Sequence, residues 1–295
     1  MQFAVIDIGS NAVRLVFAHA TGDINNITVE RASLIRVPLR LGKDVFKSSK
    51  ISKIREKKLL KTMKAFKLLI GVMEPENVRA CATSAMREAS NSSKIIKKIS
   101  EETGIKIEII SGSDEAEIIR DTNKMIFDQP DQLQIMIDVG GGSTEISAER
   151  NGELIKLKSF EIGTIRILNN NYDNNIWDEM SEWLMEFKNN YGKINVIGTG
   201  GNINKIKKLF GDRNSIDLQK ETIEKTISTL QPLSIEERIT LYSMRKDRAD
   251  VIIPAAKVFL YILQQLQCDK IRVPRIGLAD GMVHKLYKEY LLEQE

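Results

Sequence analysis

The chain has 295 residues, 42% of them hydrophobic and 28% charged, so it can bury a sizeable core and is not expected to be disordered. With only two histidines and two cysteines, it lacks the side chains for a multi-histidine metal site or a zinc cluster. The cysteines are isolated and no apolar run reaches membrane-spanning length, so we expect a cytoplasmic protein that binds no membrane.

The first predicted elements form two hairpins beside an aspartate. The stretch FAVIDIGSNAVRLVFAHATGDI (residues 3–24) predicts an apolar strand that ends near Asp7, a glycine turn and a second strand. A polar turn at Gly22-Asp23 then leads into a third strand over 28–37. The order of turns and strands predicts a β-meander.

A basic segment follows. Residues 1–124 hold 22 Lys and Arg against 15 Asp and Glu, whereas the remainder holds 22 against 25. Much of the excess lies in Lys47–Lys67, which predicts a surface helix with a lysine face. That face is either simply solvated or steers a polyanionic ligand. Aromatic residues make up only 6% and do not alternate with basic ones, so no nucleic-acid partner is expected. The apolar residues at roughly helical spacing are Ile51, Ile54, Met63, Phe66 and Ile70.

Strands then alternate with helices. We expect a strand at 78–85 that leads into a helix, and a strand at 106–112 followed by a helix over 113–127. A proline among polar residues in 123–132 predicts a domain boundary there.

The hairpin pattern returns 131 residues after its first occurrence, in QIMIDVGGGSTEISAERNGEL. Asp138 corresponds to Asp7 and Gly140 to Gly9, and a third strand follows over 154–160. A supersecondary unit that occurs twice predicts two similar structural units in the fold.

The duplication also predicts the domain organisation. Two similar α/β domains, residues 1–124 and 125–295, would face each other across a cleft, and each would contribute an aspartate and a glycine turn. In the second domain, 194–202 predicts a strand that ends in another glycine-rich turn. The last helix, about 281–295, is left open to pack back on the first domain.

The repeated turns carry candidate chemistry. The run Gly140–Gly142 exposes backbone N–H groups, which commonly bind phosphate oxygens. Asp7 and Asp138 either form Asx turns or, as a pair, hold a hydrated Mg²⁺ that carries phosphate. Glu145 is either a solvent-facing strand residue or a further contact to that metal.

Two charged residues at predicted helix starts are further candidates. Arg87 opposes the helix dipole, so it is either paired with an acid or directed at an anion, and the two alternatives are about even. Glu115 shares its helix start with other acidic residues, which are common there. Because no histidine lies in a glycine motif, Glu115 is the plausible general base to orient a water.

In chain order, these segments resemble the exopolyphosphatase and guanosine pentaphosphate phosphohydrolase family. The resemblance runs through almost the whole chain and rests on DIGSNAVRLVFA, LRLG, CATSAMREA, IISGSDEAE, IDVGGGSTEI, IGTGGN and DRADVIIPAAKVF. It implies two ribonuclease H-like domains of the actin-like ATPase superfold, with mixed sheets. It also implies a hydrolase that removes the terminal phosphate from polyphosphate or from the stringent-response nucleotide guanosine pentaphosphate.

The resemblance assigns roles to residues. Glu115 would orient the attacking water, Arg87 would clamp a phosphate, and Mg²⁺, or alternatively Mn²⁺, would be held by Asp138 and Glu145 with Asp7 near them. The expected phosphate-binding residues are Gly9, Ser10, Asn11, Gly140, Gly141, Gly142, Ser143, Thr199, Gly200, Gly201 and Arg248.

Three departures from the family pattern favour short polyphosphate or a nucleotide polyphosphate over long chains. Glu117 stands where members often carry arginine, and Ala279-Asp280 replaces Arg-Glu in the closing motif. The sequence also ends at Glu295, without the helical C-terminal domains that hold extended polyphosphate in longer members. A non-catalytic polyphosphate or alarmone sensor and a small-molecule kinase of the same superfold stay open as alternatives, and so does a homodimer.

Overall fold

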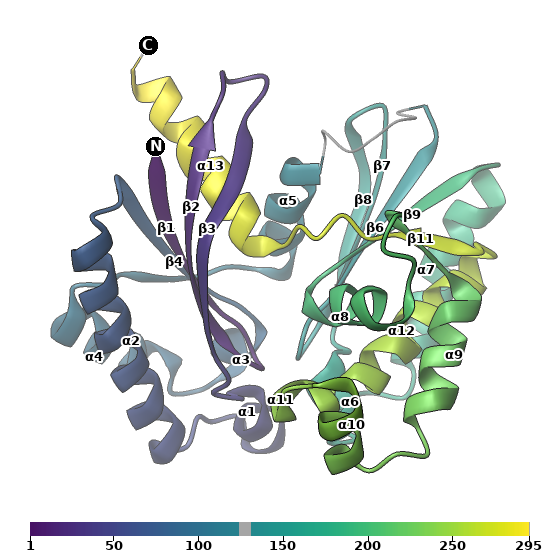
Figure 1. Ribbon diagram of the computed structural model, residues 1–295, viewed down its shortest axis with the longest axis horizontal. Helices are drawn as coiled ribbons and strands as arrows, with labels where there is room; N and C mark the ends of the chain where they lie inside the picture. Colours follow the sequence, from purple (N-terminus) through teal and green to yellow (C-terminus); the bar gives the residue numbers. More distant parts are fainter. Residues whose placement is uncertain (124–130, 295) are drawn as a thin grey trace. The chain divides into compact units, whose positions relative to one another are not determined.

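The computed structural model describes residues 1–123 and 131–294, and these form two compact units (Figure 1). The first unit comprises Met1–Thr122 together with Gly277–Glu295, and the second comprises Asn123–Ile276. The expected domain boundary between 124 and 125 lies outside the described residues. The division into those two domains and the cleft between them therefore stay predictions.

The first unit is built on a five-stranded mixed sheet in the order β3-β2-β1-β4-β5. The first three strands form an antiparallel meander, and β4 and β5 continue the sheet parallel to β1. The strands are β1 (Gln2–Ile8), β2 (Val13–Thr21), β3 (Thr28–Val37), β4 (Asn77–Ala82) and β5 (Ile107–Ile109).

The second unit repeats this sheet, in the order β10-β11-β9-β6-β7-β8. Its meander is β6 to β8, its parallel strands are β9 and β11, and β10 adds an antiparallel edge. The predicted duplication and the mixed α/β fold class are thereby confirmed. The strands are β6 (Leu133–Val139), β7 (Thr144–Arg150), β8 (Glu153–Phe160), β9 (Ile194–Thr199), β10 (Asp217–Gln219) and β11 (Lys270–Arg272).

Turn chemistry explains the tight hairpin of the second meander. Asn151 and Gly152 connect β7 to β8 with φ angles of 54° and 79°. Two successive residues at positive φ give a turn whose twist matches the flanking strands, and asparagine and glycine adopt that region most readily. The sequence-based turn at this position is therefore correct.

Most helices of the first unit lie within residues 42–123, and one comes from the end of the chain. The predicted lysine-rich helix is in fact two helices, because Ser49 at φ 51° ends α1 before α2 begins. Ile54 was expected on the apolar face of this helix but is 70% exposed, since Leu59, Met63 and Phe66 form the buried face. The helices are α1 (Gly42–Ser48), α2 (Lys53–Met73), α3 (Ser84–Glu88), α4 (Ser92–Thr103), α5 (Gly112–Asn123) and α13 (Leu278–Glu293).

The closing helix α13 packs across the first sheet, where Figure 1 shows it running over the meander. The rings of Phe3 and Tyr287 meet edge-on at 5.9 Å, and the Tyr287 hydroxyl donates to the carbonyl of Gly22 at 2.9 Å. The Arg31 guanidinium also forms an ion pair with Asp280 in the first turn of α13. Residues from both ends of the chain therefore build one unit.

The core of the second unit surrounds α12 (Ile252–Leu266), which packs against α6, α7, α8 and α9 and against the sheet. The expectation that no apolar run reaches membrane-spanning length is wrong for Lys246–Leu266, which has the length and composition of a span, but most of it is buried among these elements. We therefore interpret it as a core helix. The remaining helices are α6 (Thr164–Leu168), α7 (Ile176–Asn190), α8 (Gly201–Phe210), α9 (Lys220–Leu230), α10 (Ile235–Tyr242) and α11 (Lys246–Ala249).

Candidate functional site

The predicted site residues lie at the carboxyl ends of the parallel strands in each unit. In the first unit β1 ends at the turn that carries Gly9, while β4 and β5 lead into the helices α3 and α5 that carry Arg87 and Glu115. In the second unit β6 and β9 end in the turns that carry Gly140 and Gly200. Ligands of α/β sheets bind outside the carboxyl ends of parallel strands, so the fold brings the predicted residues of each unit to a suitable edge.

The glycine loop of the second unit, Gly140–Ser143, is a tight turn between β6 and β7. It is closed by a hydrogen bond from the Gly140 N–H to the Ser143 carbonyl at 2.9 Å. The N–H groups of Gly141, Gly142 and Ser143 donate no hydrogen bond to any other residue that the structure describes. The loop therefore has consecutive amides that could donate to a phosphate, and its binding of phosphate stays a prediction.

A cross-strand pair of carboxylates flanks this loop. Asp138 on β6 lies directly opposite Glu145 on β7, and oxygens of the two carboxylates lie within 4.8 Å of each other. Glu145 is only 2% exposed and accepts a hydrogen bond from the Ser159 hydroxyl at 2.8 Å. Like charges at directly opposite positions are unfavourable in a sheet, so this pair fits a bound cation, for which carboxylate oxygens are suitable ligands.

The second glycine turn packs against the same aspartate. The Thr199 hydroxyl donates to Asp138 Oδ1 at 2.8 Å, and a Cβ at Gly200 would lie 2.7 Å from that oxygen. Gly200 also has φ +93°, so glycine is required here by space and by conformation. These contacts orient the Asp138 carboxylate.

Arg248 lies beside this turn. Its guanidinium, on the short helix α11, donates to the side chain of Asn202 and covers the space next to Gly201. The structure thus brings Arg248 to the second glycine turn, although 46 residues of sequence separate it from Asn202.

In the first unit, the turn at Gly9, Ser10 and Asn11 has the same form. The Gly9 N–H donates to the Ala12 carbonyl at 3.1 Å, as Gly140 does to Ser143 in the second unit. The Ser10 hydroxyl accepts a hydrogen bond from the Ala85 N–H at 3.2 Å and so connects the turn to the start of α3. Ser10 therefore has a structural role, and its contact to phosphate stays a prediction.

Asp7 differs from Asp138 in its partner. The residue opposite Asp7 on β2 is Arg14, and the two side chains form an ion pair. Because an arginine already neutralises its carboxylate, Asp7 is less suited than Asp138 to hold a metal ion. Its role near the metal stays a prediction.

Arg87 connects two of the strand ends in the first unit. Its guanidinium donates to the carbonyl of Ile110 at 2.8 Å, just after β5. Of the two alternatives for Arg87, the described residues contain no acidic partner for it. An arginine has five N–H donors, so this one bond leaves the guanidinium able to contact an anion.

Glu115 differs from the acidic residues around it. It is 8% exposed, whereas Glu117 is exposed on the same helix and lies 3.8 Å from Arg120. Asp114 caps α5 by accepting from the Ser111 N–H and hydroxyl, and these bonds, its side-chain bond to Ser111 first, lower the pKa of Asp114. Ser111 and Asp114 therefore form the cap of α5 together, and Glu115 takes no part in it.

Sequence reasoning missed the start of α6 (Thr164–Leu168), the helix that follows β8. The backbone N–H of Thr164 donates to the Gly140 carbonyl at 3.0 Å, and that of Ile165 donates to the Gly141 carbonyl at 2.8 Å. Arg166 Nε donates to the Gly142 carbonyl at 2.7 Å. The one local signal in the sequence was the glycine at position 163. Its extended φ of −147° is open to any residue, but a Cβ there would meet the backbone of Gly141 and Gly142, so space requires the glycine.

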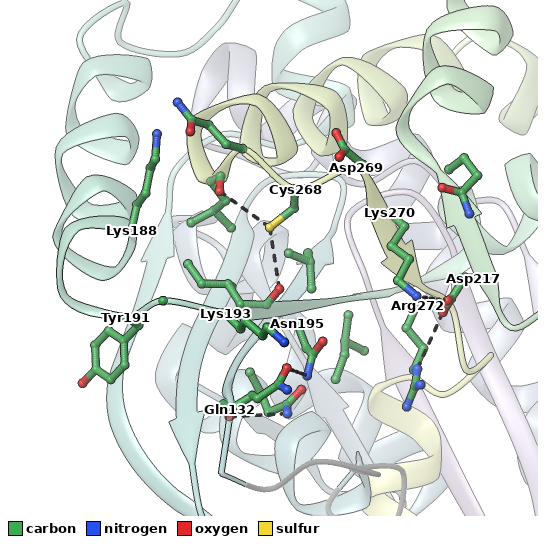
Figure 2. Close-up of a pocket in the computed structure, with 18 residues that line it drawn as sticks. Gln132, Lys188, Tyr191, Lys193, Asn195, Asp217, Cys268, Asp269, Lys270 and Arg272 are labelled. Atoms are coloured by element: carbon green, nitrogen blue, oxygen red, sulfur yellow. Dashed lines mark hydrogen bonds and ion pairs between the residues drawn. The ribbon is translucent and has the colours of Figure 1, made fainter.

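Figure 2 shows a polar pocket of about 510 Å³ in the second unit, which lies away from these turns. Gln132 and Asn195, joined by a hydrogen bond of 3.1 Å, place it at the amino-terminal ends of β6 and β9. The glycine loop lies at the opposite ends of these strands. Burial raises the pKa of the Cys268 thiol in this pocket to about 11, so this thiol is protonated at neutral pH.

Comparison with protein families gives one match that spans most of the chain. The model of the Ppx/GppA phosphatase family matches residues 15–290. Among curated proteins, the chain is 34% identical to a bifunctional 3-dehydroquinate synthase/phosphatase of Fusobacterium nucleatum over 216 residues, which are 66% of this chain and 32% of that protein. It is 30% identical to exopolyphosphatase 1 of Mycobacterium tuberculosis over 169 residues, which are 57% of this chain and 48% of that protein. The chain thus spans about a third to a half of the length of these relatives.

Solved structures support the fold. An exopolyphosphatase from Cytophaga hutchinsonii superposes with a TM-score of 0.84 at 21% identity, covering 98% of both chains. A Ppx/GppA family member from Aquifex aeolicus gives a TM-score of 0.74 at 24% identity, covering 100% of this chain and 99% of the other. At these identities the likeness concerns the fold alone.

Proposed function

Because the chain belongs to the Ppx/GppA phosphatase family, we propose that it is a phosphohydrolase that removes the terminal phosphate from inorganic polyphosphate or guanosine pentaphosphate. The observation that carries this proposal is the carboxylate pair of Asp138 and Glu145 beside the amides of Gly141–Ser143, which donate to no other described residue. Phosphoryl transfer depends mainly on positioning and on neutralising charge. This arrangement provides for both.

In the proposed reaction, each backbone or side-chain group has its own role. The amides of Gly141–Ser143 hold the oxygens of the terminal phosphate, and Arg87 neutralises part of their charge. Glu115 orients a water and accepts its proton as the water oxygen attacks the terminal phosphorus. The bond from that phosphorus to the bridging oxygen then breaks, and the shortened chain departs with the oxygen.

Asp138 and Glu145 are the residues that would hold Mg²⁺, with Mn²⁺ as an alternative. Their oxygen donors match the preference of these ions, and a cation would relieve the repulsion between them. A bound Mg²⁺ would neutralise phosphate charge. Asp138→Asn and Glu145→Gln should therefore abolish the rise in melting temperature that Mg²⁺ produces, whereas Glu117→Gln should preserve it.

The decisive experiment compares phosphate release from tripolyphosphate, long polyphosphate, guanosine pentaphosphate and ATP, each with Mg²⁺ and with EDTA. We expect release that requires the metal, with tripolyphosphate or guanosine pentaphosphate preferred to long polyphosphate. Binding of these compounds without any release would favour the sensor. Phosphate transfer from ATP to an added alcohol, without hydrolysis of polyphosphate, would favour the kinase.

We also propose that the protein acts in the cytoplasm, where thiols remain reduced. Both cysteines are free, and burial raises the pKa of the Cys81 thiol to about 11, which keeps it from reacting. Polyphosphate and guanosine pentaphosphate are the proposed partners, and their relative preference is decided by the experiment above.

A further inference from the structure

We propose that Arg166 is a positioning residue that orients the glycine loop for phosphate, an inference that rests on the proposed function of that loop. The carbonyl groups of the glycine run all have partners in the residues that follow β8. The Gly140 and Gly141 carbonyls accept hydrogen bonds from the backbone of Thr164 and Ile165, and the Gly142 carbonyl accepts one from Arg166 Nε. Every carbonyl of the glycine run is therefore directed toward the segment that follows β8.

The direction of the carbonyls determines the direction of the amides. In a trans peptide the C=O of one residue and the N–H of the next point in opposite directions. The N–H groups of Gly141, Gly142 and Ser143 therefore point away from the segment after β8. These are the same amides that donate to no other described residue. The segment thus directs a row of donors outward.

Close packing makes this support rigid. A Cβ at Gly163 would lie 2.6 Å from the backbone carbon of Gly141 and the nitrogen of Gly142. Real Cβ atoms do not approach backbone atoms so closely, so the two segments could not keep their spacing with alanine at this position. The Thr144 hydroxyl adds a further bond, to the Ile162 carbonyl at 2.6 Å.

Arg166 contributes the one side chain among these bonds to the glycine carbonyls. It is 6% exposed, and its Nε–H···O bond to Gly142 is 2.7 Å long. A charged donor to a backbone carbonyl makes a stronger hydrogen bond than a neutral one, and loss of either partner leaves a buried polar group unsatisfied. Without this bond the peptide between Gly142 and Ser143 would lose the contact that fixes its orientation.

The first unit uses a similar device built from backbone N–H groups. After β3, the N–H of Arg40 donates to the Asn11 carbonyl and the N–H of Gly42 donates to the Ser10 carbonyl, both at 2.9 Å. The segment after the third strand thus supports the first turn in both copies of the repeat. Only the second copy has three glycines in succession, and there the Arg166 side chain holds the last of them.

The test compares Arg166→Met and Arg166→Lys with Arg238→Met as a matched control. Arg238 lies in the same unit, and its Nε also donates to a backbone carbonyl, that of Leu230 at 2.9 Å, away from the glycine loop. The measurements are the amide NMR signals of Gly141, Gly142 and Ser143 during titration with pyrophosphate, and kcat and KM for tripolyphosphate. The variants are compared below their melting temperatures.

Arg166→Met should weaken pyrophosphate binding at the loop by about ten-fold or more. It should raise KM for tripolyphosphate by a similar factor, and Arg166→Lys should recover part of the loss. Arg238→Met should change stability but neither KM nor the loop signals. Equal affinity in Arg166→Met and wild type, or an equal loss in Arg238→Met, would overturn the inference while leaving the proposed function intact.

The amide signals separate the two proposals. If wild-type amides respond to pyrophosphate and lose that response in Arg166→Met, but no substrate is hydrolysed, the inference holds and the proposed hydrolysis is wrong. If wild-type amides do not respond to pyrophosphate at all, the loop is not a phosphate site and the inference is overturned.

Discussion

Residues 14 and 145 occupy equivalent positions of the duplicated hairpin, but one is basic and the other acidic, so the two copies differ in the charge that faces their aspartate. Arg14 neutralises Asp7 across β1 and β2, whereas Glu145 adds a second negative charge opposite Asp138. A sheet tolerates opposite charges at such positions but not like charges without a counter-ion. The second copy is therefore the one suited to a cation.

At the residue scale, Glu115→Gln should lower turnover of tripolyphosphate by about a hundred-fold or more. The amide keeps the shape of the side chain but cannot accept the proton of the attacking water. Substrate should still bind, with an unchanged or lower KM, because one negative charge near the phosphates is removed. Steady-state phosphate release provides both constants.

Glu117→Gln is the matched control for this prediction. Glu117 lies on the same helix but is exposed and close to Arg120, so its variant should keep turnover near the wild-type value. Equal losses in the two variants would show that the base has been misassigned.

At the scale of elements, the ends of helices explain departures from the family pattern. Asp280 replaces a glutamate that commonly follows arginine in the closing motif, and it accepts a hydrogen bond from the Gly277 N–H at 2.8 Å. The same carboxylate pairs with Arg31 on β3. Asp280 thus caps α13 and attaches it to the first sheet.

We expect Asp280→Ala to lower the free energy of unfolding by about 1–3 kcal/mol, because it removes the cap and leaves Arg31 without this partner. Asp280→Asn keeps a capping oxygen and should lose less. Chemical denaturation measures both changes. Glu289→Ala is the control, since its carboxylate is about half exposed and lies 3.4 Å from Arg79. A loss as large as that of Asp280→Ala would contradict the anchoring role.

At the scale of the whole molecule, the uneven charge predicts how salt affects catalysis. Residues 1–124 carry seven more basic than acidic side chains, and a field of this sign attracts polyanions. We expect kcat/KM for polyphosphate to fall by roughly ten-fold as salt rises from about 0.02 to about 0.5 M, with little change in kcat. A value of kcat/KM that does not change with salt would exclude steering.

The sequence by itself determined the duplicated meander, the mixed α/β class and the glycine turns, because these depend on local patterns. Alternating apolar residues specify a strand, and consecutive glycines specify a backbone that a ligand can approach, without reference to distant residues. It also marked Asp138, since an acidic residue beside such a turn contributes little to packing, and Glu115, since no histidine lies in a glycine motif to act as the base. The exposure of Ile54 was missed because a helical period alone does not say which stripe is buried.

Only the tertiary structure decided which partners these residues have. Arg166 lies 24 residues from Gly142, and Arg31 lies 249 residues from Asp280, and nothing local distinguishes either arginine from one on the surface. The roles of Arg14 and Glu145 likewise depend on tertiary structure, because the strand register places them opposite Asp7 and Asp138. A hydrogen bond or ion pair is a property of two groups in space, and the chain specifies their meeting only through the packing of the sheets and helices that carry them.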